Sequence, residues 1–291
     1  MINLILLLKD YLYAKDVNPP HVYRAEETIK LIIQEKLSVS RFGDGEFDML
    51  LNINHPKYQK NDVSLVQKLS AVFNSNNKNL LICIPDVFSN DSLRPLTGKA
   101  ARHWERFLIK NRKKLYQIFN FNKKYGDALF TRHYIDIQDK SKSELYFNHV
   151  KDIWVNRDII IVEGIYTRFG VGNDLLENAK NIKRILCPEK DAYDKYNEIL
   201  AVCKEQNKDA LFLLALGPTA TVLAYDLCNE GFQAIDIGHL DIEYEWFLQH
   251  ADKKCAVPNK WVNETDDIVT NENDTLHDEK YESSIIYEIK I

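Results

Sequence analysis

Two hydrophobic periodicities alternate along most of the chain. Apolar residues recur at helical spacing over residues 23–36, 61–73, 99–119, 174–179, 192–205 and 219–229. Between them stand short runs rich in Ile, Leu and Val at residues 37–42, 80–84, 158–162, 184–187, 210–216 and 233–237. Continuous apolar strands are typical of a parallel sheet that helices cover on both faces. The pattern therefore predicts an α/β fold with a doubly wound, mostly parallel sheet of about six strands.

The two ends of the chain depart from this alternation. No internal repeat or low-complexity linker divides residues 1–251, so we expect them to form one domain. Residues 252–280 are rich in Asp, Asn, Glu and Lys and predict a polar tail, and residues 284–291 are a candidate edge strand. The apolar run at residues 2–8 predicts the start of a packed or surface helix. It is too short to cross a bilayer, so no transmembrane segment is expected.

Composition and charge narrow the possible partners. The 38 basic and 43 acidic residues give a net charge of −5, which provides no global attraction to nucleic acid. A bound phosphate must therefore be held by local groups. The five cysteines are widely spaced and form no CxxC pair, so the sequence predicts neither a disulfide framework nor a zinc site, and a reducing cytoplasm fits best.

Four polar segments that contain glycine directly follow predicted strands. They lie at residues 43–46, 163–174, 217–221 and 238–245. In an open α/β sheet these positions gather at the carboxyl edge of the strands, where ligands bind. The sequence therefore predicts one ligand site that all four loops share.

The first of these loops contains two acids in the sequence SRFGDGEF. Asp44 and Glu46 are two positions apart, so in an extended stretch both side chains point to one side and can share a divalent cation. The neighbouring Gly43 and Gly45 allow close approach of a ligand. The alternative is a tight turn in which Asp44 caps the following helix and Glu46 lies in its first turn.

The third loop has the form of a helix start. Pro218 follows Gly217 and suits the first helical position, which leaves the amides of Thr219 and Ala220 directed outward as an anion site. The alternative is an ordinary strand-to-helix turn that binds nothing.

The second loop contains TRFGVGND. Gly170 and Gly172 permit a backbone cradle, and Arg168 is available to a phosphate. The alternative is a glycine turn capped by Asn173 or Asp174. No complete GxGxxG and no GxxxxGK[ST] motif occurs, which argues against a dinucleotide-binding protein and a P-loop nucleotidase.

The fourth loop, GHLDIEYE, offers carboxylates for proton transfer. Asp241 or Glu243 could act as a general base, while the alternative is that these acids complement the start of a helix.

Two carboxylates at about 4 Å would each oppose a phosphate by roughly 4 kcal/mol at an effective dielectric of about 20. A divalent cation bound between the carboxylates and the phosphate makes their net interaction attractive. The acidic pair and the anion-suited loops are therefore consistent with a metal-bound diphosphate.

Taken in order, the motifs resemble those of a known family. SVSRFGDGEF, VEGIYTRFGVGNDLL, CPEKDAYDKYNEIL, LALGPTATVLAYDL and IDIGHLDIEYEWF are similar to segments of the bacterial glycosyltransferases with the GT-D fold, over about residues 37–247. The resemblance implies a Rossmann-like sheet and transfer of a hexose from a nucleotide-diphosphate sugar, commonly a UDP sugar, to a glycan or glycoprotein acceptor. It places the family's DxE motif for Mn²⁺ or Mg²⁺ on Asp44 and Glu46.

The resemblance also gives a set of expected site residues. The positions expected to contact the donor are Arg41, Gly43, Arg168, Gly170, Gly172, Asn173, Asp174, Gly217, Pro218 and Thr219, and the candidate bases are Asp241 and Glu243. Two other functions use the same residues. One is a metal-dependent phosphohydrolase, and the other is a nucleotide-sugar binding module without catalysis.

Overall fold

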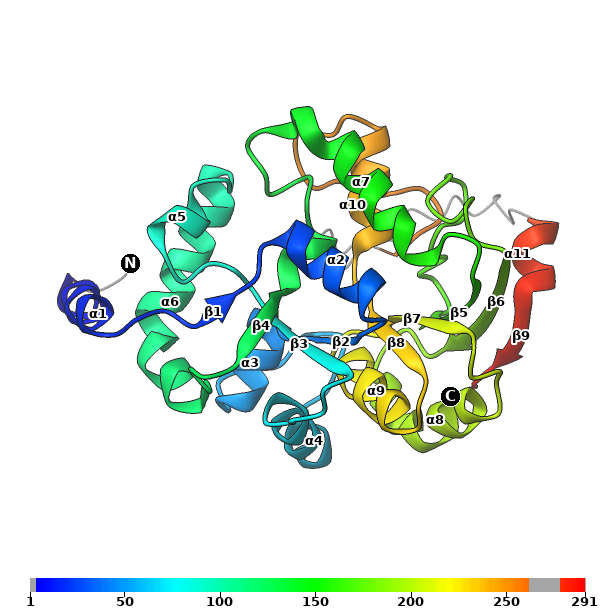
Figure 1. Ribbon diagram of the computed structural model, residues 1–291, viewed down its shortest axis with the longest axis horizontal. Coiled ribbons are helices and arrows are strands. Elements are labelled where there is room, and N and C mark those ends of the chain that lie inside the picture. The colour runs from blue at the N-terminus through cyan, green and yellow to red at the C-terminus, as the bar shows by residue number, and fades with distance from the viewer. Residues whose placement is uncertain (1–3, 262–277, 291) are drawn as a thin grey trace.

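Every strand pair in the sheet is parallel. The computed structural model describes residues 4–261 and 278–290, which form one nine-stranded sheet in the order β1-β4-β3-β2-β8-β7-β5-β6-β9 (Figure 1). The strands are β1 (His21–Val22), β2 (Ser38–Arg41), β3 (Leu80–Ile84), β4 (Lys124–Asp127), β5 (Asp158–Gly164), β6 (Asn181–Cys187), β7 (Leu211–Ala215), β8 (Gln233–Asp236) and β9 (Ile285–Glu288).

Helices cover both faces of this sheet. They are α1 (Leu4–Asp16), α2 (Ala25–Gln34), α3 (Asp44–Leu50), α4 (Val63–Phe73), α5 (Asn90–Leu93), α6 (Gly98–Ile118), α7 (Ser143–Lys151), α8 (Tyr196–Lys204), α9 (Pro218–Asn229), α10 (Leu240–Leu248) and α11 (Glu279–Ser284). Helices α2, α7 and α10 pack on one face, and α3, α4, α6, α8 and α9 pack on the other (Figure 1). The doubly wound α/β architecture predicted from the sequence is confirmed.

Alternate side chains of the central strands enter two separate hydrophobic cores. In β7, Phe212 and Leu214 join the core under α4, α8 and α9, whereas Leu211 and Leu213 join the core under α2, α7 and α10. All four are fully buried. Because both faces of the strand are covered, no polar residue interrupts it, which explains the continuous apolar run in the sequence.

The sheet has nine strands rather than about six. Strand β1 has only two residues, too few for a periodic signal. Strand β4 has the sequence KYGD, which lacks an apolar run because its Gly126 lies against β3, where an added Cβ would come within 2.5 Å of Cys83 Sγ. Strand β9 pairs with β6 at one edge of the sheet.

The helix expected at residues 174–179 is not formed. These residues make turns, in which Glu177 N–H donates to Asp174 O and Ala179 N–H donates to Leu176 O, each three positions back. The Asn173 side chain also accepts the Leu175 N–H at 3.0 Å. This local bond competes with helix formation, as Asn side chains commonly do. Between β3 and α6 the chain also forms the short helix α5.

The predicted tail is described only in part. Residues 252–261 pack back on α10 through Lys260, which is 4% exposed, and residues 262–277 lie outside the described ranges. All five cysteines are free thiols. No helix within residues 4–261 and 278–290 combines the length and hydropathy required to cross a membrane.

Helix α4 gives a direct test of a capping assignment. Asn61 and Asp62 both precede this helix and both are residue types that commonly cap helices. The structure assigns the cap to Asp62, whose Oδ1 accepts the N–H groups of Ser64 and Leu65 at 2.7 and 3.1 Å. We expect Asp62→Ala to destabilise the protein by about 1 kcal/mol, because two amides lose their acceptor. Asn61→Ala is the matched control and should leave the urea midpoint unchanged. Equal midpoints for the two variants would contradict the assignment.

The strand order reverses direction beside β2. From β2 the chain adds β3 and β4 on one side, whereas the later strands β8, β7, β5 and β6 lie on the other. At such a switch point the loops that follow the two neighbouring strands diverge and leave a crevice at the carboxyl edge. The crevice between β2 and β8 is therefore where a ligand site is expected.

Candidate active site

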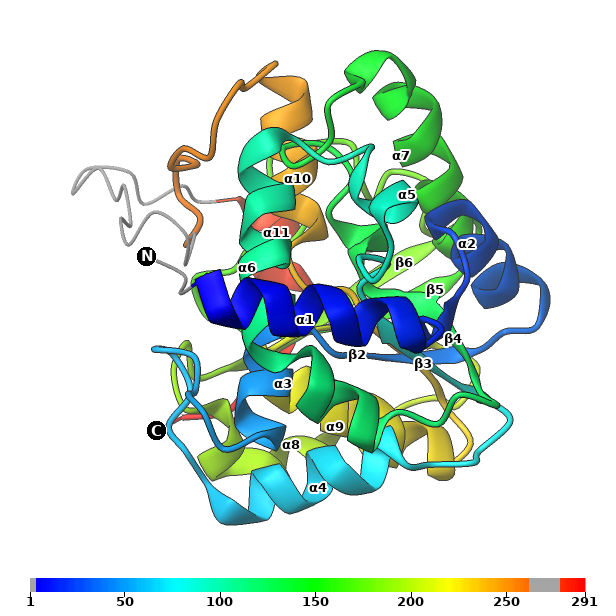
Figure 2. The ribbon, with the colours of Figure 1, turned by 90° about the vertical axis from the view of Figure 1, so that its left-hand side faces the viewer.

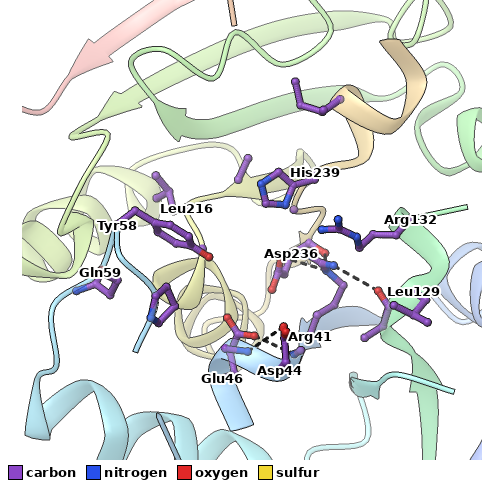
Figure 3. A pocket seen from close by; sticks show the side chains of 18 of the residues that line it. Arg41, Asp44, Glu46, Tyr58, Gln59, Leu129, Arg132, Leu216, Asp236 and His239 are labelled. Atoms are coloured by element: carbon purple, nitrogen blue, oxygen red, sulfur yellow. Dashed lines mark hydrogen bonds and ion pairs between the residues drawn. The ribbon is translucent and has the colours of Figure 1, made fainter. Parts of the chain in front are cut away.

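A cavity of about 600 Å³ opens at the carboxyl edge of β2 and β8. Its lining includes residues from all four polar loops, together with residues of α6 and of the segments at 54–59 and 128–136 (Figure 3). This size is in the range of pockets that bind a small-molecule ligand. This cavity is therefore a candidate site at the position that the strand order indicates.

Arg41 and Asp236 join the two strands at the floor of the cavity. Arg41 Nη2 lies 2.9 Å from Asp236 Oδ1, and its Nε donates to Asp236 O at 2.8 Å. Arg41 Nη1 donates to Thr131 Oγ1 at 2.7 Å. At Gly238, which has a φ of +51°, an added Cβ would lie 1.8 Å from Arg41 Nη2, so only glycine fits there. The guanidinium expected to contact a ligand is thus held by protein groups.

Asp44 lies at the first turn of α3, with its side chain half exposed to the cavity. Its Oδ2 lies 2.9 Å from His103 Nε2, and its Oδ1 accepts the Gly45 N–H at 3.1 Å. Burial raises the pKa of Asp44, but the hydrogen bond and charge of His103 and the charge of Arg132 outweigh it and hold that pKa below its usual range. Asp44 therefore offers an anionic carboxylate to the cavity.

Glu46 has both a capping role and a place in the cavity lining. Its Oε2 accepts the N–H of Gly43, the N-cap residue of α3, at 2.8 Å. Burial raises the pKa of Glu46 to about 7, with a further contribution from the charge of Asp236. The extended conformation expected for this segment is wrong, because both acids lie on a helical turn. The predicted alternative, a helix start, is the observed conformation, although Gly43 rather than Asp44 is the cap.

Whether Asp44 and Glu46 can hold a divalent cation depends on which other groups can also bind that cation. Within the described ranges, no group of three or more His, Cys, Asp or Glu side chains is arranged to hold a metal ion by itself. Asp48, one turn beyond Asp44, also lines the cavity, and its buried Oδ1 has no hydrogen-bond partner among the described residues. Mg²⁺ typically takes one or two carboxylates and completes its shell with water and substrate phosphates. The acids Asp44, Glu46 and Asp48 fit that mode of binding.

Within the predicted loop at residues 217–221 only Gly217 lines the cavity, next to Leu216, which precedes that loop. Gly217 lines it with a φ of +54°, and an added Cβ would lie 2.6 Å from the ring of Tyr58. Pro218 occupies the first position of α9, as predicted, but it and Thr219 are buried away from the lining. The Ala220 N–H donates to Gly217 O at 2.9 Å, so this amide is not directed outward as expected.

In the loop after β5, most of the residues expected to bind a donor do not line the cavity. Arg168, Gly170, Gly172, Asn173 and Asp174 are absent from the cavity lining, which instead includes Gly164, Thr167 and Phe169 from this segment.

Specific contacts hold these side chains in place. Asp174 pairs with Lys151 Nζ at 2.6 Å, and the Asn173 amide donates to Asp241 Oδ1 at 2.8 Å. The Arg168 guanidinium lies 5.9 Å from the centre of the Tyr281 ring.

The two candidate bases differ in position. Asp241 lines the cavity and is ion-paired with the buried Lys260 at 2.6 Å. Glu243 is completely buried outside the lining, where its Oε2 accepts the N–H groups of Tyr134 and Ile135 at 3.0 Å. Burial raises the pKa of Glu243 to about 7, although the charge of Arg132 opposes this. The structure thus separates two acids that the sequence treats alike.

Several lining residues were not among those expected from the sequence. They are Tyr58, His103, Trp104, Arg132, Asp236 and Trp261. Only Asp236 has a local signal, because it is a charged residue at the end of an apolar strand, two positions before Gly238, where the ligand edge lies. The others come from a helix and from irregular segments, whose approach to the cavity depends on tertiary packing.

The chain matches a known family over most of its length. The family model described as "Glycosyltransferase GT-D fold" matches residues 39–265. The chain is 37% identical over 266 residues to the "Probable glycosyl transferase Gly" of Streptococcus gordonii, and this match covers 91% of the chain and 38% of the relative. It is 36% identical over 285 residues to the "Glycosyltransferase GlyD" of Streptococcus pneumoniae serotype 4, covering 98% of the chain and 34% of the relative. The chain therefore spans little more than a third of these curated relatives.

Solved structures share the fold along the whole of their chains. One is described as "the highly conserved domain of unknown function 1792", with a distinct glycosyltransferase fold. It superposes with a TM-score of 0.89 at 37% identity and covers 97% of this chain and 100% of that one. Another, "a new glycosyltransferase (DUF1792) from Streptococcus sanguinis", gives a TM-score of 0.86 at 35% identity, with 94% and 100% covered.

Proposed function

The chain belongs to the glycosyltransferase GT-D fold family, and from this premise we propose that it transfers a hexose from a nucleotide-diphosphate sugar, preferentially a UDP sugar, to a hydroxyl group of a glycan or glycoprotein acceptor. The observation that supports this most directly is the pair Asp44 and Glu46 in the cavity beside β2 and β8. An acidic cavity repels a bare diphosphate, but it suits a diphosphate that binds together with a divalent cation.

We assign the donor side of the cavity to the β2 loop and α3. Asp44 and Glu46 would hold Mn²⁺ or Mg²⁺, which when bound stabilises the negative charge on the leaving diphosphate. His103 orients Asp44 through the bond between Nε2 and Oδ2. Gly217 lines the cavity at the start of α9, where a helix N-terminus favours the negative charge of a phosphate.

We assign the acceptor side to the start of α10. Asp241 lines the cavity and Glu243 does not, so Asp241 is the better placed of the two to accept the proton of the acceptor hydroxyl. Lys260 and Asn173 fix the orientation of its carboxylate from two sides. This role applies to a reaction that inverts the anomeric carbon, since a retaining reaction needs no such base.

The first experiment measures donor binding and turnover together. Nucleotide sugars are screened by thermal shift with Mn²⁺ or EDTA, and hits are incubated with a panel of acceptor sugars and analysed by mass spectrometry. We expect a UDP sugar to raise the melting temperature only with the metal, because a ligand that binds the native state alone stabilises it. We also expect transfer to depend on the acceptor.

The same experiment separates the alternatives. Cleavage of the donor diphosphate by water, detected as UMP and sugar 1-phosphate at a rate that no acceptor increases, would indicate a metal-dependent phosphohydrolase. Metal-dependent binding without turnover on any acceptor would indicate a binding module. Transfer at an equal rate in EDTA would contradict the assigned role of Asp44 and Glu46.

A further inference from the structure

Helix α1 directs its apolar face away from the molecule. Leu4, Leu8 and Leu12 are 77%, 57% and 53% exposed, and Tyr11 between them is 55% exposed. Because an α-helix has 3.6 residues per turn, these four positions form one continuous stripe along its outer side. In an amphipathic helix of a globular protein such a stripe normally faces the core. Here it faces outward, so packing among residues 4–261 and 278–290 does not explain it.

The inner face of α1 is fixed by specific contacts with α6. Asp10 Oδ1 lies 2.9 Å from Arg112 Nε, and both side chains are nearly buried. The rings of Tyr13 and Tyr116 are 5.9 Å apart between centroids. Figure 2 shows α1 lying across α6 on the outside of the molecule. The orientation of the apolar stripe is therefore set by a polar bond and an aromatic contact.

The helix beneath α1 is strongly basic in a chain that is acidic overall. Helix α6 contains seven basic residues and one acidic residue, a net charge of +6, whereas the whole chain has a net charge of −5. At 3.6 residues per turn, the exposed Arg102, Arg106 and Lys113 lie on the face of α6 that adjoins its contact with α1. Positive charge is thus concentrated on the helix that carries α1, next to the contact between the two helices.

We propose that α1 and the adjoining basic face of α6 dock this protein on the surface of an anionic lipid bilayer. An apolar helical stripe flanked by cations is the combination that binds in the headgroup region, where leucine side chains enter the acyl boundary and Lys and Arg attract anionic headgroups. With 13 residues α1 is about 20 Å long, too short to span the membrane, so it lies in the membrane plane. The charge of α6 favours an anionic bilayer over an uncharged apolar partner.

Vesicle co-sedimentation tests this without any substrate. The vesicles are phosphatidylcholine alone and phosphatidylcholine mixed with phosphatidylglycerol. We expect wild-type protein to bind the anionic vesicles at least about tenfold more tightly, and added salt to weaken that binding. Leu8→Glu/Leu12→Glu should lower the affinity at least about tenfold. Arg106→Glu/Lys113→Glu should lower it about fivefold for each cation, on anionic vesicles only.

A matched control and a mass measurement complete the test. Leu145→Glu introduces one glutamate, against two in the α1 variant, at a leucine on α7 that is 66% exposed, and it should bind vesicles like wild type. Circular dichroism melting checks that each variant is folded. Equal binding by wild type and the α1 variant, or no binding to anionic vesicles, would overturn the proposal. So would a dimer by light scattering that Leu8→Glu/Leu12→Glu converts to a monomer, because a second copy would then cover the stripe.

Discussion

Replacing Asp44 with asparagine is expected to lower kcat/KM for hexose transfer at least about a hundredfold, while the melting temperature stays unchanged. The side chain of Asp44 is half exposed and bonds to His103, so its loss removes no core contact. Asparagine keeps the shape of the side chain but removes its negative charge, and with it one of the two charged ligands proposed for the cation. The measurement is initial-rate kinetics with a UDP sugar and Mn²⁺, together with nucleotide binding by calorimetry.

Two further variants test this prediction. Asp91→Asn removes a carboxylate that is 83% exposed on α5, and activity should not change. Glu46→Gln should reduce activity like Asp44→Asn, yet remain folded, because glutamine can still accept the Gly43 N–H that caps α3. Wild-type affinity of Asp44→Asn for UDP with Mn²⁺ present would show that this carboxylate does not bind the metal.

Replacing Arg184 with methionine is expected to lower the free energy of unfolding by about 3–5 kcal/mol. The side chains of Glu163 and Arg184 are 0% and 4% exposed and form an ion pair. Phe169 bonds to both, since its N–H donates to Glu163 Oε2 at 2.7 Å and its O accepts from Arg184 Nη2 at 2.8 Å. Without the guanidinium, the Glu163 carboxylate remains buried with a single donor. Urea denaturation measures the difference.

The same variant has a defined pH dependence. Burial already raises the pKa of Glu163 above its ordinary value, although the charge of Arg184 opposes this. Removing Arg184 raises that pKa further. A carboxyl group whose pKa is raised by folding favours the folded state less as the pH rises through that pKa, so the loss should be smaller at about pH 5 than at about pH 8.

A double variant and a surface pair serve as controls. Glu163→Gln/Arg184→Met removes both charges and should recover part of the lost stability, because no uncompensated charge stays buried. Lys204→Met breaks a pair with Glu230 in which both side chains are 43% exposed, and it should cost at most about 1 kcal/mol. If the single and double Arg184 variants were equally unstable, burial of an unpaired charge would not be the cause.

The fold follows from local sequence patterns wherever a strand is covered on both faces. Strands β3, β5 and β7 form continuous apolar runs because each buries alternate side chains in the two cores. Strand β4 could not be found in this way, since Lys124 and Gly126 give it neither an apolar run nor an alternating pattern. Its position is determined by pairing with β3, which is a tertiary contact.

The sequence predicts which loops form the site. It does not predict every residue that lines it. Four loops were expected at one edge, and the cavity includes residues from all four. Asp44 and Glu46 are found because their spacing is local. Side chains such as Asn173 and Asp174 lie in the right loop but turn toward Lys151 and α10, and no local pattern reports that direction.

The pairing of β2 with β8 also constrains how the protein can fold. Arg41 and Asp236 are 195 residues apart, although they form the floor of one cavity. During synthesis β2, β3 and β4 are complete long before β8 exists, so β2 then has an unpaired edge that can pair wrongly. Contacts between such distant segments are entropically costly to form and slow to appear. The cavity therefore cannot exist in a nascent chain until β8 has docked on β2.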